Sequence, residues 1–504
     1  MNYNRREFIK ISGITAAGTM IIPPILNSCT GVRLSDNAGS YLGHFEVTTD
    51  VLQKVIAAAM DKGADYADLY FEHTINNTSA LEDGKVNSAY SNVAYGVGIR
   101  AVKGDQTGYA YSEDLSAEAM VRAARTAASI ADSSPAVNSV KISEYMAPGY
   151  YSVKTSWEDT SIKDKIPYMQ RMNDKIFEAD LRVSKANVYL MDTSSYILYY
   201  NSEGLLTWDY RPMVVIAGIC IMEENGRIEN FYVTRSSRMG SEFLTNELVD
   251  EMSAEVVART AKLFSASRPK TGEMEVVMGA GQSGILLHEA MGHAFEADFN
   301  RKNQSIFSDR MGKKIAEDFV TIVDDGTIPG NRGSLNFDDE GIPTEKTILV
   351  KDGTLTSYLH DRISAGYYKV KPTGNGRRQS FRHIPMPRMR STYMENGPHR
   401  KEEIIASVKS GIYVDYFSNG EVNIGQGDFT FFVKFGYMIE NGKLTTPIKD
   451  INVIGNGPQA LADIVMVADD MAIDNGGGTC GKNGQSAPVT MGMPTVKIRK
   501  LTVG

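Results

Sequence analysis

The stretch Leu205-Leu-Thr-Trp-Asp-Tyr-Arg-Pro-Met-Val-Val-Ile-Ala-Gly-Ile-Cys-Ile-Met222 decides the fold class of this chain. Its second half is a continuous apolar run rich in β-branched residues, which is typical of a buried strand. We interpret Cys220, inside that run, as a buried strand residue, because a free cysteine behaves as a small apolar group. Residues 188–201 and 228–235 on either side also have strand patterns, so the three segments predict one sheet.

The sequence on the N-terminal side adds more strands to this sheet, together with helices. Strand patterns occur at residues 65–73, 78–83, 85–91, 94–102 and 107–111. Apolar residues at helical spacing predict helices at residues 50–62, 116–131, 161–179 and 242–264. Ser116 is expected to cap the second of these helices. These elements predict an N-terminal α+β domain over residues 40–265, with helices packed on a largely antiparallel sheet.

The second half of the chain has a different character. The polar residues 265–273 include Pro269 and Gly272 and form the expected domain boundary. Over residues 270–504 we expect a β-rich C-terminal domain that carries one helix, at residues 283–299, and the two histidines of this helix make it the candidate metal-binding helix. Asp352-Gly353 and Asn441-Gly442 are hairpin turn sequences, and predict hairpins between residues 347–351 and 354–360 and between 429–440 and 443–446. The expected fold class of the whole chain is therefore α+β.

The composition limits the classes of function. The chain has 504 residues, of which 42% are hydrophobic and 23% charged, so two to four globular domains are expected. A formal net charge of −8 argues against a nucleic-acid surface as the main partner. No run of about 18 apolar residues follows the N-terminal segment, so we expect no membrane-spanning segment in the body of the protein.

The segment of residues 1–29 predicts an export signal. Arg5-Arg6 stand before a hydrophobic residue and a weakly apolar run, which is the layout of a twin-arginine signal. Leu26-Asn-Ser-Cys29 resembles a lipoprotein processing site, so Cys29 is expected to carry a lipid and the protein to be periplasmic or membrane-anchored. A fortuitous basic start on a cytosolic protein, and cleavage without a lipid, are the alternatives. Only Cys220 and Cys480 remain beyond this segment, so no disulfide framework is expected.

Two histidines stand five residues apart in Leu286-Leu-His-Glu-Ala-Met-Gly-His-Ala-Phe-Glu296. Zinc peptidases commonly place such histidines four residues apart, on one helical face. Five residues turn an ideal α-helix by about 140°, so His288 and His293 can share one ion only across a π-bulge. Gly292 suits such a distorted turn. The alternative is a pair of core or capping histidines.

A lone cysteine lies in the glycine-dense segment Asn475-Gly-Gly-Gly-Thr-Cys-Gly-Lys-Asn-Gly484. Glycines let a backbone approach another surface closely, and a thiolate with two imidazoles is an accepted catalytic zinc set. Lys482 is expected to help keep the thiol of Cys480 ionised. A flexible turn with an incidental thiol is the alternative.

Four strings together resemble the TldD family of the TldD/PmbA metallopeptidases. They are His288-Glu-Ala-Met-Gly-His-Ala-Phe-Glu-Ala-Asp298, Val323-Asp-Asp-Gly-Thr-Ile-Pro-Gly-Asn-Arg-Gly-Ser334, Gly374-Asn-Gly-Arg-Arg-Gln-Ser-Phe-Arg-His-Ile-Pro-Met-Pro-Arg-Met389 and Gly477-Gly-Thr-Cys-Gly-Lys482. The resemblance covers essentially the whole chain after the signal. It implies a zinc site made by His288, His293 and Cys480, with Glu289 catalytic. The export signal departs from the family, whose members are usually cytosolic.

The resemblance further implies a dimer, either with a second copy or with a PmbA-like subunit, and an active site reached by unfolded peptide through a narrow channel. Zinc lowers the pKa of its bound water toward about 7 and polarises the scissile carbonyl. Glu289 would accept the proton of that water and pass it to the leaving amine. Glu296 lies on the same helical face as His293 and is expected to orient its imidazole, with a solvated carboxylate as the alternative.

The remaining basic residues and histidines have weaker interpretations. The arginines between residues 377 and 390 either line a groove for a peptide carboxylate or, as we favour, pair with the acidic residues Asp324, Asp325, Asp338 and Asp339. His360 and His383 are candidate oxyanion donors and substrate-binding residues. His44, His73 and His399 are predicted to lie on the surface.

Two other classes of function compete with a peptidase. A non-catalytic assembly or binding subunit with a structural zinc would need a fourth protein ligand, and no second cysteine lies near either motif. A redox enzyme exported by the twin-arginine route would need a cofactor motif, and the sequence has no dinucleotide fingerprint, haem string or iron–sulfur spacing.

Overall fold

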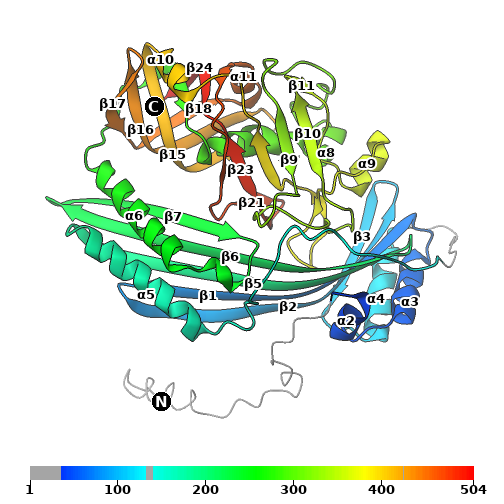
Figure 1. The fold of residues 1–504 in the computed structure, drawn as a ribbon. Coiled ribbons are helices and arrows are strands. Elements are labelled where there is room, and N and C mark those ends of the chain that lie inside the picture. Colours follow the sequence, from blue (N-terminus) through cyan, green and yellow to red (C-terminus); the bar gives the residue numbers. More distant parts are fainter. Residues whose placement is uncertain (1–35, 132–139, 424) are drawn as a thin grey trace, which may run out of the picture. The chain divides into compact units, whose positions relative to one another are not determined.

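The computed structural model describes residues 36–131, 140–423 and 425–504. Residues Ser35–Gly504 form one compact unit. The structure confirms the α+β class, with a long sheet in the N-terminal half and short strands in the C-terminal half (Figure 1). The predicted export signal and Cys29 lie outside the described residues. Among the described helices, none is long and apolar enough to cross a membrane.

A seven-stranded sheet forms the N-terminal half. Its strands are β1 (Tyr66–Glu82), β2 (Lys85–Lys103), β3 (Gln106–Ser112), β4 (Ser143–Tyr145), β5 (Val183–Asn201), β6 (Leu205–Glu224) and β7 (Arg227–Ser237). The order is β3-β2-β1-β5-β6, and both β4 and β7 pair with the outer edge of β6. Every pairing is antiparallel except that of β4 with β6. The largely antiparallel sheet is therefore confirmed.

The prediction of separate short strands in the first hairpin was wrong. Residues 66–73 and 78–82 belong to one strand, and residues 85–91 and 94–102 to the next. The polar residues between them stay in the sheet because they bond across it. Asn77 donates to Asp192 (2.8 Å), and Asn76 accepts from Thr193 (2.8 Å), so neither side chain breaks the strand.

Helices α2 (Ala38–His44), α3 (Thr49–Met60), α4 (Ala117–Ala128), α5 (Ile162–Ala179) and α6 (Asn246–Leu263) accompany this sheet. Ser116 caps α4 as predicted, accepting from the Ala119 N–H at 3.3 Å. Helices α5 and α6 pack on one face of the sheet in a shared apolar core that includes the fully buried Cys220. Gly218 allows the close approach of α5, because a Cβ there would lie 2.0 Å from Met172 Cε.

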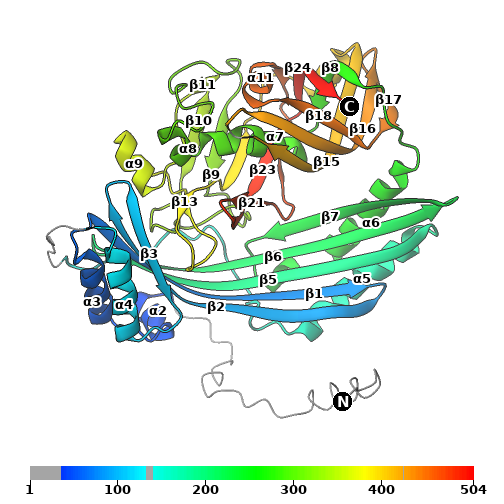
Figure 2. The ribbon, with the colours of Figure 1, turned by 180° about the vertical axis from the view of Figure 1, so that it is seen from behind.

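The C-terminal half contains a closed ring of strands. Strand β15 (Ser410–Val422) pairs with β8 (Gly272–Met278), β8 with β24 (Val496–Val503), β24 with β18 (Ile451–Asn456), β18 with β16 (Asp428–Glu440), and β16 with β15 again. Strands β17 (Lys443–Ile448) and β19 (Ile464–Val467) extend it. Because the ring closes on itself, its five strands leave no open edge between them (Figure 2).

A second sheet lies beside the ring. Its strands, in order, are β11 (Thr354–Leu355), β10 (Lys346–Lys351), β9 (Ile322–Asp325), β14 (Ser391–Met394), β23 (Thr490–Met493) and β20 (Ala472–Asp474). Two ribbons of two strands complete this half: β12 (Gly376–Arg377) with β13 (Met386–Pro387), and β21 (Thr479–Lys482) with β22 (Gln485–Pro488). Short helices α9 (Arg362–Tyr368), α10 (Lys401–Ala406) and α11 (Gly457–Ala462) connect these strands.

Both predicted hairpins are present, but the strand predicted at residues 354–360 is too long. It ends at Leu355, because the following residues leave β10 and turn toward another segment. Leu359 donates its N–H to the Phe295 carbonyl (2.9 Å) and accepts from the Ala297 N–H (3.0 Å). The chain after the hairpin is therefore attached to the segment that carries the paired histidines.

Three histidines predicted on the surface are half-buried. His44 Nε2 lies 2.8 Å from His73 Nδ1, and the two rings stack with their centroids 5.0 Å apart. His399 Nδ1 lies 3.1 Å from the Val467 carbonyl. Each ring has a polar partner from another part of the chain. Local sequence does not show such partners, and the prediction of surface positions was wrong for this reason.

Buried ion pairs join the sheet to the C-terminal half. Arg100 of β2 bonds Asp68 of β1 through Nε (2.9 Å) and Glu340 through Nη1 (2.6 Å), and all three side chains are fully buried. A buried charge that loses its partner is strongly destabilising. These contacts therefore fix the second half of the chain on the sheet.

We expect Arg100→Met to lower the free energy of unfolding by about 3–5 kcal/mol, because it leaves the buried Glu340 carboxylate without its cation and leaves Asp68 only the longer pair with Arg378 (3.7 Å). Lys346→Met is the matched control, since it removes the exposed pair with Glu395 and should cost at most about 1 kcal/mol. Urea unfolding of both variants measures the difference. Equal losses in the two variants would contradict the assignment.

Candidate metal centre

The helix predicted at residues 283–299 is broken into short pieces of different pitch. It begins as the 3₁₀ turn η3 (Gln282–Gly284) and α7 (Ile285–Leu287). It continues as the π-turn η4 (His288–Gly292) and the 3₁₀ turn η5 (His293–Phe295), and resumes as α8 (Ala297–Arg301). The π-turn expected from the five-residue spacing is present. It brings the rings of His288 and His293 to a centroid separation of 5.2 Å, which an ideal α-helix would not allow.

The reason for the glycine in this turn differs from the prediction. The backbone of Gly292 is ordinarily helical, with φ −59° and ψ −48°, so no unusual conformation requires glycine. A Cβ at this position would instead lie 2.1 Å from Met389 Sδ. Gly292 is therefore needed for close packing against Met389, a residue that belongs to another of the four sequence strings.

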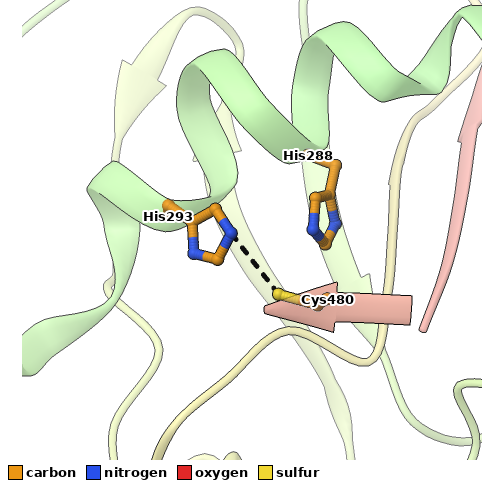
Figure 3. A group of neighbouring side chains, drawn as sticks. All are labelled: His288, His293 and Cys480. Atoms are coloured by element: carbon orange, nitrogen blue, oxygen red, sulfur yellow. Dashed lines mark hydrogen bonds between the residues drawn. The ribbon is translucent and has the colours of Figure 1, made fainter. Parts of the chain in front are cut away.

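Cys480 reaches the histidines from the ribbon β21–β22. Its Sγ lies 3.4 Å from His293 Nε2, and the side chain is 2% exposed. The ligand atoms of His288, His293 and Cys480 all lie within 4.8 Å of one another. Figure 3 shows the two rings and the sulfur turned toward a common point. Residues far apart in the sequence thus form one buried cluster.

Two arginines hold the cysteine ribbon in place. Arg332 donates to the Gly478 carbonyl (2.8 Å) and to Thr479 Oγ1 (3.2 Å). Arg388 is fully buried and donates to the Cys480 carbonyl and to the Gln485 carbonyl. These bonds fix a glycine-rich segment that would otherwise be free to move. We assigned no role to Arg332 from sequence, although it lies within one of the four strings.

The predicted pairing of the arginine-rich segment is correct for some members and wrong for others. Arg390 pairs with Asp324 (2.7 Å), as expected, and both are fully buried. Asp339 pairs instead with Arg211 of the N-terminal sheet, and Arg388 binds carbonyl groups. Carbonyl oxygens also accept hydrogen bonds from an arginine, and sequence does not show which acceptor a given arginine meets.

Glu296 binds the second nitrogen of His293. Its Oε2 lies 3.0 Å from His293 Nδ1, and the carboxylate is fully buried. With Nδ1 bound to Glu296, the Nε2 atom faces the cysteine sulfur. A carboxylate on the far nitrogen of a ligating histidine fixes the orientation of the ring.

Lys482 contacts carboxylates rather than the thiol. Its Nζ lies 3.0 Å from Glu296 and 2.7 Å from Asp298, and it donates to the Pro387 carbonyl at 3.0 Å. The prediction that Lys482 would keep the thiol of Cys480 ionised was therefore wrong in its mechanism. Side chains of β21 alternate between two directions, so residues 480 and 482 share a side, but the lysine extends past the sulfur to α8.

The electrostatics of the cluster favour charged side chains. Burial acts to raise the pKa of the Cys480 thiol, but the neighbouring His288 and His293 lower it to about 5. Burial likewise acts to raise the pKa of Glu296, and Lys482 and His293 lower it to about 2. These surroundings favour the thiolate form of Cys480 and the carboxylate form of Glu296.

The donors of the cluster fit a zinc ion. Two imidazoles and a thiolate are accepted ligands for Zn²⁺. In the described part of the chain, the buried Nδ1 of His288 has no hydrogen-bond partner. Glu289 lies between the histidines in sequence, is half-buried, and is not a member of the cluster.

The other two candidate histidines lie outside the cluster that the described residues form. His360 is buried against Tyr358 and Tyr368, and burial lowers its pKa to about 4. His383 is half-buried, with its Nδ1 2.9 Å from Ser380 Oγ. Their proposed roles as oxyanion donors or in substrate binding remain predictions.

Family models match most of the described chain. The PmbA/TldA metallopeptidase domain 1 matches residues 67–131, the central domain residues 155–264, and the C-terminal domain residues 271–504.

Curated relatives match over nearly their whole length. A "Metalloprotease TldD homolog" of Buchnera aphidicola is 38% identical, over 87% of this chain and 92% of the relative. One of Haemophilus influenzae is 36% identical, over 94% and 99%. A "Zinc metalloprotease TldD homolog" of Saccharolobus solfataricus is 27% identical, over 90% and 99%. The crystal structure of TldE from Thermococcus kodakarensis shares the fold, with a TM-score of 0.70 and 19% identity over 90% of this chain and all of that one.

We expect Glu296→Gln to weaken zinc binding by about 10–100-fold, because an amide holds the His293 ring less firmly than a carboxylate does. Competition with a chromophoric chelator measures the dissociation constant. Glu402→Gln, an exposed glutamate on α10, is the matched control and should leave zinc affinity unchanged. An unaltered affinity in Glu296→Gln would remove this residue from the metal centre.

Proposed function

The chain belongs to the PmbA/TldD metallopeptidase family, and we therefore propose that it is a zinc-dependent peptidase that cleaves unfolded peptides. His288, His293 and Cys480 would hold the zinc, and Glu289 would act as the general base. The observation that carries this proposal is the buried cluster of two imidazoles and one thiol within 4.8 Å of one another. The name of the Saccharolobus solfataricus relative supports zinc as the metal.

The residues around the cluster support hydrolysis. A zinc ion in such a site activates water as a nucleophile at neutral pH and polarises a carbonyl group. Glu289 follows a ligand directly and is half-buried, so its carboxylate is available to take a proton from the attacking water. The same carboxylate would then deliver that proton to the leaving amine. Glu296 keeps the His293 ring oriented throughout.

The number of protein ligands favours a catalytic over a structural zinc. A structural site is commonly closed by four protein ligands, whereas a catalytic site keeps one position open. The cluster found among the described residues has three members. This count supports the peptidase over the assembly subunit with a structural zinc.

The partner and the location are proposals of the same kind. We propose that the protein works as a dimer, with a second copy or a PmbA-like subunit, and that extended peptide is its substrate. We also propose export by the twin-arginine route to the periplasm or to a membrane anchor at Cys29. Arg5-Arg6 and the sequence that ends at Cys29 support the export proposal.

We expect Glu289→Gln to keep about one zinc per chain but to lower peptide turnover by about 10²–10⁴-fold, because it removes the proton acceptor and leaves the ligands intact. Cys480→Ala should lose both zinc and turnover. Elemental analysis and cleavage of an unstructured peptide measure the two effects.

Cys220→Ala is the control for Cys480→Ala, since it removes an equally buried thiol from the N-terminal sheet. It should keep zinc and activity. Zinc that survives in Cys480→Ala would refute the ligand set, and zinc without turnover in the wild type would favour the assembly subunit.

For export, we expect replacement of Arg5 and Arg6 by lysine to retain the protein in the cytoplasm of a host with a twin-arginine pathway. Cys29→Ser should abolish labelling by a radioactive fatty acid while export continues. Cell fractionation and labelling of the wild type and both variants measure this. Cytoplasmic wild-type protein would contradict the proposal.

A further inference from the structure

The ribbon that carries Cys480 has little backbone support. Strands β21 and β22 pair only with each other among the described strands, and they join neither large sheet of the C-terminal half. Four residues of β21 face four of β22. An isolated two-stranded ribbon is marginally stable by itself. Side-chain contacts must therefore hold the thiol at the histidines.

Most side-chain contacts of the ribbon join it to loops and not to the segment that carries the two histidines. Arg332 and Arg388 bind carbonyl groups of the ribbon and of the segment that leads into it. Gln485 accepts from the Gln379 N–H and donates to the Ile384 carbonyl. These three side chains fix the ribbon to loops of the C-terminal half of the chain. None of these bonds reaches the segment that contains His288 and His293.

Lys482 makes that connection. It is two residues after Cys480, and its side chain is 2% exposed. The ammonium group lies 3.0 Å from Glu296, the carboxylate bound to His293, and 2.7 Å from Asp298 in α8. It also lies 4.3 Å from the centre of the Phe299 ring. The lysine therefore ties the cysteine ribbon to the residues that follow the second histidine.

We propose that Lys482 is a positioning residue that assembles the metal centre by joining the Cys480 ribbon to Glu296. It aims the Glu296 carboxylate at His293 Nδ1 and holds Cys480 Sγ beside His293 Nε2. This inference rests on the proposed function, because it assumes that the cluster binds zinc. It adds to that function the residue that brings the two ligand segments together.

The physical reason lies in the buried charges. Glu296 is fully buried and Asp298 is 15% exposed, so their carboxylates need a nearby cation. A three-donor ammonium group satisfies both carboxylates and the Pro387 carbonyl at once. Loss of this group leaves Glu296 free to turn away from His293. The ribbon that carries Cys480 is then no longer held at a fixed distance from the segment that carries His288 and His293.

Lys482→Met tests the proposal, because methionine keeps an unbranched apolar stem and removes the ammonium group, with its charge and its three hydrogen-bond donors. We expect its zinc affinity to fall by about 10–100-fold, as for other residues that orient metal ligands. In the cobalt-substituted protein, the thiolate-to-cobalt charge-transfer band should weaken or shift. Unchanged affinity and an unchanged band would overturn the proposal.

Lys497→Met is the matched control. Lys497 is also buried and pairs with Glu275 in the ring of strands (2.7 Å), so its loss should lower stability and leave the cobalt spectrum intact. A control variant with the same loss of zinc affinity would show that Lys482→Met acts through general destabilisation. That result would also overturn the proposal.

The double variant Lys482→Met with Glu296→Gln shows whether the lysine acts through the glutamate. Residues that act as one unit have non-additive effects. We expect the zinc affinity of the double variant to equal that of whichever single variant binds zinc more weakly. A loss of affinity equal to the product of the two single losses would refute the connection. A wild type that bound no zinc would refute the proposed function. A wild type that bound zinc, together with a Lys482→Met variant of equal zinc affinity, would refute this inference and leave the proposed function standing.

Discussion

Cys480 Sγ lies 3.4 Å from His293 Nε2 inside the protein, and the polar groups around this contact are bound by buried cations. A thiolate in an apolar interior is unfavourable unless positive charge or hydrogen-bond donors compensate for lost water. The neighbouring histidines lower the thiol pKa, and Arg388 and Lys482 bind the carbonyl and carboxylate groups beside it. In the C-terminal half, the broken helix and the cysteine ribbon are held in the positions that bring these groups together.

The π-turn illustrates how this need changes local structure. A regular helix would point His288 and His293 in different directions, and a single widened turn brings them to the same side. The distortion is stabilised by its surroundings: Met389 packs where a side chain at Gly292 would lie, and Leu359 bonds to Phe295 just beyond the turn. An isolated peptide of this sequence would have neither support.

The N-terminal sheet contributes to the same site indirectly. Helices α5 and α6 cover one face of the sheet. The sheet also binds the C-terminal half through Arg100 and Arg211, whose carboxylate partners include Glu340 and Asp339. The edge strand β7 also contacts the segment before Cys480, since the Ser236 N–H donates to the Asn475 carbonyl at 2.7 Å. The sheet thus helps to place the glycine-rich segment that leads to Cys480. The placement of Cys480 therefore depends on contacts with both halves of the chain.

The sequence by itself determined the α+β class, most helix positions and the two hairpin turns, because these depend on local periodicity and turn chemistry. It predicted a π-turn between His288 and His293 only on the condition that the two histidines share one ion. It also indicated Cys480, first as the lone cysteine of a glycine-dense segment and then through the resemblance to a family. Only the tertiary structure decided that Lys482 binds Glu296 rather than the thiol, and that Gly292 is required by Met389. Those contacts join residues dozens to nearly two hundred positions apart, and local sequence carries no signal for which buried donor meets which acceptor.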